Sequence, residues 1–289
     1  MKLGVYLDGS TPDSFVAHAR RAEDAGLESV WVGDHLITAS PRMDSIVALT
    51  AAAAATTRVK VGFGVLVAAL RPTAWVAKQI ATLQSLSGNR VLLGIGTGGD
   101  AHGELGWRAA GVPFAERGKR TTAMLEVLPD LVAGRPATVD GVEFALAPGA
   151  EMPPLIIGSG PGLLRRVARF GDEWFPAFSA PAWIGEQRAR LAEFAAEYDR
   201  PVPGITVGVS LAVGKLPDSV LDAQVRSLTG YGMSEEQARE ALVTGSPAEV
   251  AERLAVYADA GVHRIAAMPF AGDRGEQIDL LGEVAGLLR

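Results

Sequence analysis

One stretch of the sequence decides the fold: Ala22-Glu23-Asp24-Ala25-Gly26-Leu27-Glu28-Ser29-Val30-Trp31-Val32-Gly33-Asp34-His35. Its first half has the alanine-rich, charged composition of a helix end, and Gly26 stands where a helix takes a left-handed stop. Residues 29–34 form a short run whose centre, Val30-Trp31-Val32, is apolar and β-branched or aromatic, which is typical of a buried strand. The stretch therefore predicts a helix that turns directly into a strand ending in an acid and an imidazole.

The same helix-to-strand joint returns near the other end of the chain, where Tyr257-Ala258-Asp259-Ala260-Gly261 precedes an apolar run at 264–270. Between the two joints, short β-branched runs alternate with longer segments of helical spacing, which is the pattern of a parallel sheet. We expect strands at 2–7, 29–34, 60–67, 91–96, 154–158, 173–178, 205–213 and 264–270. Eight such units, in a chain near the roughly 250 residues typical of this architecture, predict one (β/α)₈ TIM-barrel domain over residues 1–289.

Two segments exceed what the barrel needs. Residues 137–144 alternate in polarity around Asp140-Gly141, which predicts a small β-hairpin inserted before the fifth strand. Residues 216–246 are longer than one crossover helix requires and predict a helical insertion after the seventh strand.

The composition excludes several classes of protein. No apolar run reaches the roughly 18 residues of a membrane span, and the first residues lack the pattern of a signal peptide, so we expect a cytoplasmic protein. The chain has no cysteine, which excludes thiol nucleophiles, disulfides and iron–sulfur clusters. A net charge of -6 argues against nucleic-acid binding and favours a small-molecule substrate.

Histidine positions indicate where chemistry could occur, because barrel enzymes carry their active sites at the carboxyl ends of the strands. His18 falls inside a helix and His263 precedes a strand, so both are expected to be structural or merely solvated. His35 follows the second strand beside Asp34, where it could relay a proton while Asp34 orients it or binds a cofactor hydroxyl. The alternative is that the Asp34-His35 pair only caps a loop.

The loop after the fourth strand offers weaker candidates. His102 and Glu104 lie in a glycine-rich, polar stretch and could contact substrate, although a solvated loop histidine is an equal alternative. Residues 94–99 match the Gly-x-Gly-x-x-Gly pattern of an open, doubly wound dinucleotide fold. That fold requires a helix directly after the glycines, whereas the next helix is expected only from about residue 114, so we favour a turn.

The segment after the fifth strand is the best candidate for binding an anion. Gly158, Ser159, Gly160 and Gly162 precede a helix predicted over residues 163–170, with Pro161 acceptable in its first turn, and free amides at such a helix start can hold a phosphate. An ordinary turn is the alternative. The full nucleophile-elbow pattern is missing around Ser159, and no metal-ligand spacing occurs, so we expect neither a serine nucleophile nor a metal.

Several segments, in this order, resemble the bacterial luciferase-like family of flavin- and deazaflavin-dependent oxidoreductases. They are residues 22–35, 61–67 with Arg71-Pro72, 77–83, 86–98, 111–118 and 154–160. The resemblance implies a (β/α)₈ barrel whose cofactor ring lies against the ends of strands 2, 3 and 4, with its phosphate at 158–162. It also implies a non-prolyl cis peptide bond between Gly64 and Val65.

The resemblance further implies roles for single residues. Asp34 would lie near the ring and His35 near the reacting centre, Thr97 and Gly98 would line the ring, and Glu104 would face substrate or orient its loop. The implied cofactor is coenzyme F420, with FMN as the alternative, and the implied assembly is a homodimer. A flavin reductase would be a partner only if the enzyme depended on FMN.

These observations favour a coenzyme F420-dependent oxidoreductase that transfers a hydride between deazaflavin and a small organic substrate. An FMN-dependent luciferase-like monooxygenase is the main alternative. A noncatalytic cofactor-binding barrel, or a phosphate-binding isomerase or aldolase, would also fit a barrel, although no lysine is well placed for a Schiff base.

Overall fold

The barrel is built from parallel strands that close on themselves. A computed structural model describes residues 1–9, 11–38, 40–99, 103–158, 160–230 and 232–288. Its barrel strands are β1 (Lys2–Tyr6), β2 (Ser29–Val32), β3 (Lys60–Phe63), β4 (Val91–Gly96), β7 (Leu155–Gly158), β8 (Glu173–Phe175), β9 (Gly204–Val213) and β11 (Arg264–Pro269). They are hydrogen-bonded in this circular order, β8 pairs with β9 and β11 with β1, so the predicted (β/α)₈ fold is confirmed.

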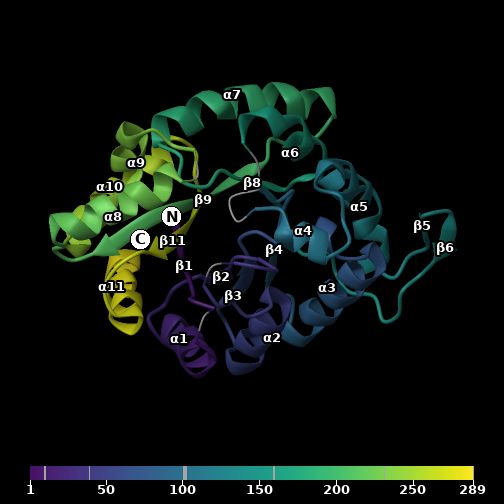
Figure 1. Cartoon of the computed structure of the whole chain (residues 1–289), viewed down its shortest axis with the longest axis horizontal. Coiled ribbons are helices and arrows are strands. Elements are labelled where there is room, and N and C mark those ends of the chain that lie inside the picture. The colour runs from purple at the N-terminus through teal and green to yellow at the C-terminus, as the bar shows by residue number, and fades with distance from the viewer. Residues whose placement is uncertain (10, 39, 100–102, 159, 231, 289) are drawn as a thin grey trace.

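Helices connect the strands and form the outer layer (Figure 1). They are α1 (Pro12–Asp24), α2 (Ser45–Ala55), α3 (Thr73–Ser87), α5 (Arg117–Val132), α6 (Leu164–Phe170), α7 (Pro181–Glu197), α10 (Pro247–Asp259) and α11 (Arg274–Leu287). The predicted stop after α1 is also present, because Gly26 adopts a φ of 76°. No helix among the described residues has both the length and the apolar character to cross a membrane.

Both predicted insertions are confirmed. Strands β5 (Ala137–Val139) and β6 (Val142–Phe144) form an antiparallel hairpin that stands away from the barrel before β7 (Figure 1). After β9, the chain forms α8 (Asp218–Thr229) and α9 (Glu235–Ala241), and then a short strand that the sequence did not predict. This strand, β10 (Val243–Gly245), pairs in parallel with the outer end of β9.

The strand period of two separates the interior of the barrel from the layer under the helices. Val30 and Val32 pack in the large core between strands and helices, whereas Trp31 between them belongs to a separate buried cluster. The other fully buried members of that cluster are Leu92, Ile156, Phe175 and Ala266. This apolar plug fills the barrel interior, so a ligand can bind only above it.

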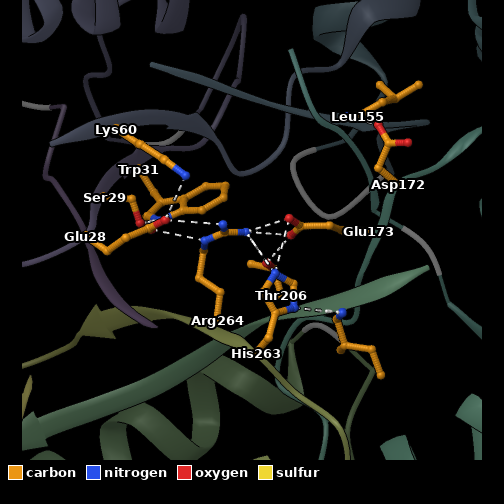
Figure 2. A network of polar contacts seen from close by, with 11 residues as sticks. Glu28, Ser29, Trp31, Lys60, Leu155, Asp172, Glu173, Thr206, His263 and Arg264 are labelled. Carbon is orange, nitrogen blue, oxygen red and sulfur yellow. Dashed lines mark hydrogen bonds and ion pairs between the residues drawn. The ribbon is translucent and has the colours of Figure 1, made fainter. Parts of the chain in front are cut away.

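A network of charged side chains closes the barrel at the amino ends of the strands (Figure 2). The Arg264 guanidinium, 2% exposed, lies between two carboxylates: Nη1 donates to Glu173 Oε2 at 2.6 Å and Nε to Glu28 Oε2 at 3.0 Å. Lys60 Nζ lies 3.3 Å from Glu28, and His263 Nε2 lies 3.2 Å from Glu173. His263 thus lies at the bottom face, as expected.

Candidate functional site

A large cavity opens at the carboxyl ends of the barrel strands, above the apolar plug. It measures about 860 Å³, within the range of small-molecule and cofactor pockets. The loops after β1, β2, β3, β4, β7, β8 and β11 all contribute to its wall. Its position is the one at which barrel enzymes carry their active sites.

The floor of this cavity is made by Val65 and by glycines of neighbouring strands. The peptide bond between Gly64 and Val65 is cis, as the family resemblance implied. A Cβ atom on Gly96 would lie 2.5 Å from a Val65 methyl group, and one on Gly158 would lie 2.8 Å from another. Only glycine fits at these two positions, so the floor exposes backbone and one branched side chain, a surface on which a flat ring can lie.

Tyr6, at the end of β1, supports this floor from within the barrel. Its hydroxyl donates a hydrogen bond of 2.6 Å to the Gly64 carbonyl oxygen. A Cβ atom on Gly64 would lie 1.9 Å from the same hydroxyl, so glycine is required there as well. Burial raises the pKa of Tyr6, which keeps the phenol protonated and able to donate.

Asp34 lines the cavity, but protein donors engage both of its carboxylate oxygens. Arg71 donates from Nη1 to Oδ2 at 2.6 Å and from Nη2 to Oδ1 at 2.9 Å, and the Val67 amide donates to Oδ2 at 2.9 Å. The Ser45 hydroxyl adds a bond of 2.8 Å to Oδ1. The Asp34 side chain is 2% exposed, so its carboxylate ties together the loops after β2 and β3 and the start of α2.

His35 differs from its neighbour because its side chain is exposed and lines the cavity. The imidazole lies over Gly33: a Cβ atom on that glycine would be 3.4 Å from His35 Cε1. A Cβ there would make only an ordinary van der Waals contact, so the ring packs closely over the backbone at Gly33. An imidazole in this place can exchange protons with a bound molecule at near-neutral pH.

The loop after β4 contributes another part of the wall. Thr97 and Gly98 line the cavity, and Gly98 has a φ of 66°, which favours glycine. The expectation that no helix begins before residue 114 was wrong, because α4 (Leu105–Ala109) precedes the 3-10 turn η2 (Phe114–Glu116) and α5. Its Trp107 packs against Phe114 and lines the cavity, and a five-residue helix is too short to give a clear periodic signal.

The remaining predicted residues divide into three groups. Gly158 and Gly160 line the cavity ahead of the 3-10 turn η3 (Pro161–Leu163) and α6. Gly162 and Glu104 are exposed and lie outside the cavity wall. Ser159 and His102 lie outside the described residues, so the predictions for them stay predictions.

Comparison with known proteins assigns the chain to a family. The profile of the family described as luciferase-like monooxygenase matches residues 2–239. The chain belongs to this luciferase-like family. The resemblance inferred from the sequence is thereby confirmed.

Two relatives match more than two thirds of the chain; one is uncharacterised and the other has an assigned activity. An uncharacterised protein of Mycobacterium tuberculosis is 30% identical over 226 residues, 68% of this chain and 77% of that protein. An F420-dependent glucose-6-phosphate dehydrogenase of Beutenbergia cavernae is 29% identical over 261 residues, 84% of this chain and 76% of that protein. Among solved structures, an F420-dependent secondary alcohol dehydrogenase with an F420-acetone adduct superposes with a TM-score of 0.85 at 20% identity, covering 100% of this chain and 99% of that one.

The luciferase-like cavity is also lined by residues that no sequence motif marks. Three of them are apolar: Phe175 at the end of β8, Trp183 in α7 and Met268 in β11. Three others are charged: Asp8, Arg42 and Arg274. Each lies in a loop or at a helix start with no motif around it, and only the closure of the barrel brings these residues together. No group of three or more metal-ligating side chains gathers anywhere in the described part of the chain.

Proposed function

We propose that this chain is a coenzyme F420-dependent oxidoreductase that transfers a hydride between the deazaflavin and a small organic substrate. The cavity floored by Val65 and glycine backbone carries the proposal, because it offers a flat, apolar seat for a tricyclic ring. Family membership and the F420-dependent relative support it. When bound, the deazaflavin would supply the redox chemistry as a hydride donor or acceptor.

The residues that would hold the cofactor follow from the cavity wall. Gly64, Val65, Thr97 and Gly98 would contact the ring from the ends of β3 and β4. The segment 158–162 would hold its phosphate through backbone amides ahead of α6, with Gly158, Gly160 and Gly162 permitting close approach and Ser159 as a cap.

His35 and Asp34 would have different roles. His35, exposed in the cavity, would give or accept the substrate proton that accompanies hydride transfer. Asp34 would act mainly by holding the loop after β3 in place, because its carboxylate accepts hydrogen bonds from the Val67 amide and from Arg71. Any contact of Asp34 with the ring would therefore be a contact of a carboxylate already neutralised by Arg71.

FMN is the second candidate cofactor, because the matching family is described as monooxygenases and the same floor would accept an isoalloxazine ring. Titrating the purified protein with F420 and with FMN, followed by fluorescence quenching, separates the two. We expect saturable binding of F420 and binding of FMN at least tenfold weaker. The reverse order would favour a monooxygenase with a partner flavin reductase, and binding of neither would reject the redox function.

We also propose a homodimer. Helices α2 and α3 lie side by side on the barrel (Figure 1) and expose Val47 and Trp75, with relative exposures of 69% and 63%. Burying such side chains against a second copy would stabilise association. Light scattering of the purified protein should give about twice the 30.1 kDa of the chain, and Trp75→Glu should shift the mass toward that of the monomer.

A further inference from the structure

Two arginines line the cavity on the side where β1 and β11 meet. Arg42 comes from the loop between β2 and α2, and Arg274 is the first residue of α11, with residues 270–273 between it and the end of β11. Asp8, which follows β1, places a negative charge beside them: its Oδ1 lies 3.7 Å from Arg42 Nη1. This corner of the cavity therefore holds two positive charges, on Arg42 and Arg274, and two negative charges, on Asp8 and on Asp273 at the start of α11.

The contacts of Arg274 show that its charge is only partly compensated. Its Nη1 donates to the Pro269 carbonyl oxygen at 2.8 Å, which fixes the guanidinium beside the cavity. Burial, and the nearby positive charge of Arg42, lower the pKa of Arg274, while the charges of Asp8 and Asp273 act in the opposite direction. Two arginines near each other are electrostatically unfavourable unless anions lie beside them; Asp8 is one such anion, and an anionic group of a bound molecule would be another.

The arginine corner lies across the barrel mouth from the segment proposed for the cofactor phosphate. In the closed sheet, β1 is separated from β7 by β2, β3 and β4 on one side and by β11, β9 and β8 on the other. Gly158 and Gly160 follow β7, whereas Asp8 follows β1. A phosphate bound at 158–162 therefore lies on the far side of the barrel mouth from the two arginines.

The wall beside this corner is apolar. Phe175 at the end of β8, Trp183 in α7 and Met268 in β11 line the cavity, and Leu36 and Ile37 line it from the same loop as Arg42. An apolar wall with one cationic corner complements a molecule with an apolar body and one anionic end. Arginine suits such an end because its planar fork pairs with carboxylate and phosphate oxygens.

We propose that Arg42 and Arg274 form a subsite for an anionic group of the substrate, a carboxylate or a phosphate, carried on an apolar body. This inference rests on the proposed function, since it assigns the substrate class of the same cavity. It divides the cavity into a cofactor side, at β3, β4 and β7, and a substrate-anion corner at β1 and β11.

The test measures probe binding by isothermal titration calorimetry, without turnover. Benzoate and phenyl phosphate carry the two anions, and benzamide is the neutral control; each is titrated into protein saturated with F420. We expect at least one anion to bind at least about tenfold more tightly than benzamide, and which one binds tells carboxylate from phosphate. Equal affinity of all three probes would overturn the subsite.

Variants assign the effect to the two arginines. Arg42→Met and Arg274→Met should weaken the anion by at least about tenfold, Arg274→Lys should retain part of the affinity, and Arg135→Met, on the far hairpin side, should bind as the wild type does. Unchanged anion affinity in both methionine variants would overturn the proposal. F420 affinity, measured separately by quenching, should stay within about threefold of the wild-type value. A loss of F420 affinity equal to the loss of probe affinity would assign the arginines to cofactor binding and would also overturn the subsite proposal. Failure of the wild type to bind F420 would reject the proposed function instead.

Discussion

Arg71 and Asp34 form a two-point ion pair beside the cavity, with Nη1 2.6 Å from Oδ2 and Nη2 2.9 Å from Oδ1. The carboxylate is 2% exposed and the guanidinium 21%. The pair joins the end of β2 to the segment after β3, because the Val67 amide donates to the same carboxylate. The positions of His35 and of the Val65 floor thus depend on one buried ion pair.

Removal of Arg71 should destabilise the fold. In Arg71→Met the buried Asp34 carboxylate loses its charge partner, which typically costs about 3 kcal/mol or more in the free energy of unfolding. Urea denaturation at pH 7 measures this difference. The matched control is Arg135→Met, which breaks an exposed ion pair with Asp130 and should cost less than about 1 kcal/mol. Equal effects of the two substitutions would show that the Asp34–Arg71 pair does not support the site.

His35 should matter for turnover far more than for cofactor binding. His35→Ala removes the exposed imidazole, and loss of a general acid or base typically lowers kcat by about 100-fold or more. F420 affinity measured by quenching should stay within about threefold. Glu143→Gln is the control, because Glu143 is exposed on the hairpin strand β6 away from the cavity and its loss should leave kcat nearly unchanged. Near-normal kcat in His35→Ala would exclude the proton-transfer role.

The charged network under the barrel predicts how stability depends on pH. Burial disfavours the charge on Glu173, but the hydrogen bond from His263 and the charge and hydrogen bonds of Arg264 and Thr206 outweigh it and lower the pKa from 4.5 to about 2. Because the folded pKa lies below the unfolded one, this contribution is fully present above about pH 4.5 and is lost as pH falls toward 2. A difference of this size corresponds to about 3 kcal/mol.

Glu173→Gln isolates that contribution. Urea denaturation from pH 7 to pH 2.5 should show the variant less stable than the wild type at neutral pH, with the gap narrowing below pH 4.5. Glu143→Gln, on the exposed hairpin strand β6, serves as the control and should follow the wild-type curve. A gap between wild type and Glu173→Gln that stays constant over the whole range would contradict the assignment.

The barrel could be predicted from the sequence because each unit carries its own local signal. The Gly26 and Gly261 stops and the apolar strand runs between them are readable one at a time, and the parallel order follows from their alternation with helices. The strand β10 was missed because it consists of three residues, Val243–Gly245, whose pairing depends on β9 far away in the chain. A local pattern cannot carry such a long-range contact.

The site was predictable where a motif marks it and not where tertiary closure makes it. His35 and the Gly64-Val65 bond lie in segments with a recognisable pattern, and the structure brings both to the cavity. Arg71 stands in a segment that resembles the family, but nothing local indicates that its side chain pairs with Asp34, 37 residues earlier. Arg274 gave no signal, because its place beside the cavity depends on where the last strand joins the first.

The contact between Val65 and Gly96 gives the sharpest test of the cavity floor. A Cβ atom at Gly96 would lie 2.5 Å from a Val65 methyl group, so Gly96→Ala should displace the Val65 side chain. Because Val65 forms the cavity floor, F420 binding should weaken by about tenfold or more. Gly286→Ala is the control, because Gly286 lies on α11 outside the cavity wall and its added Cβ would meet no atom within 4 Å, so F420 affinity should stay unchanged. The double variant Gly96→Ala with Val65→Ala removes the clashing methyl groups, and it should recover stability relative to Gly96→Ala alone. If the two substitutions were additive in both stability and F420 affinity, Val65 would not be the side chain that sets the floor.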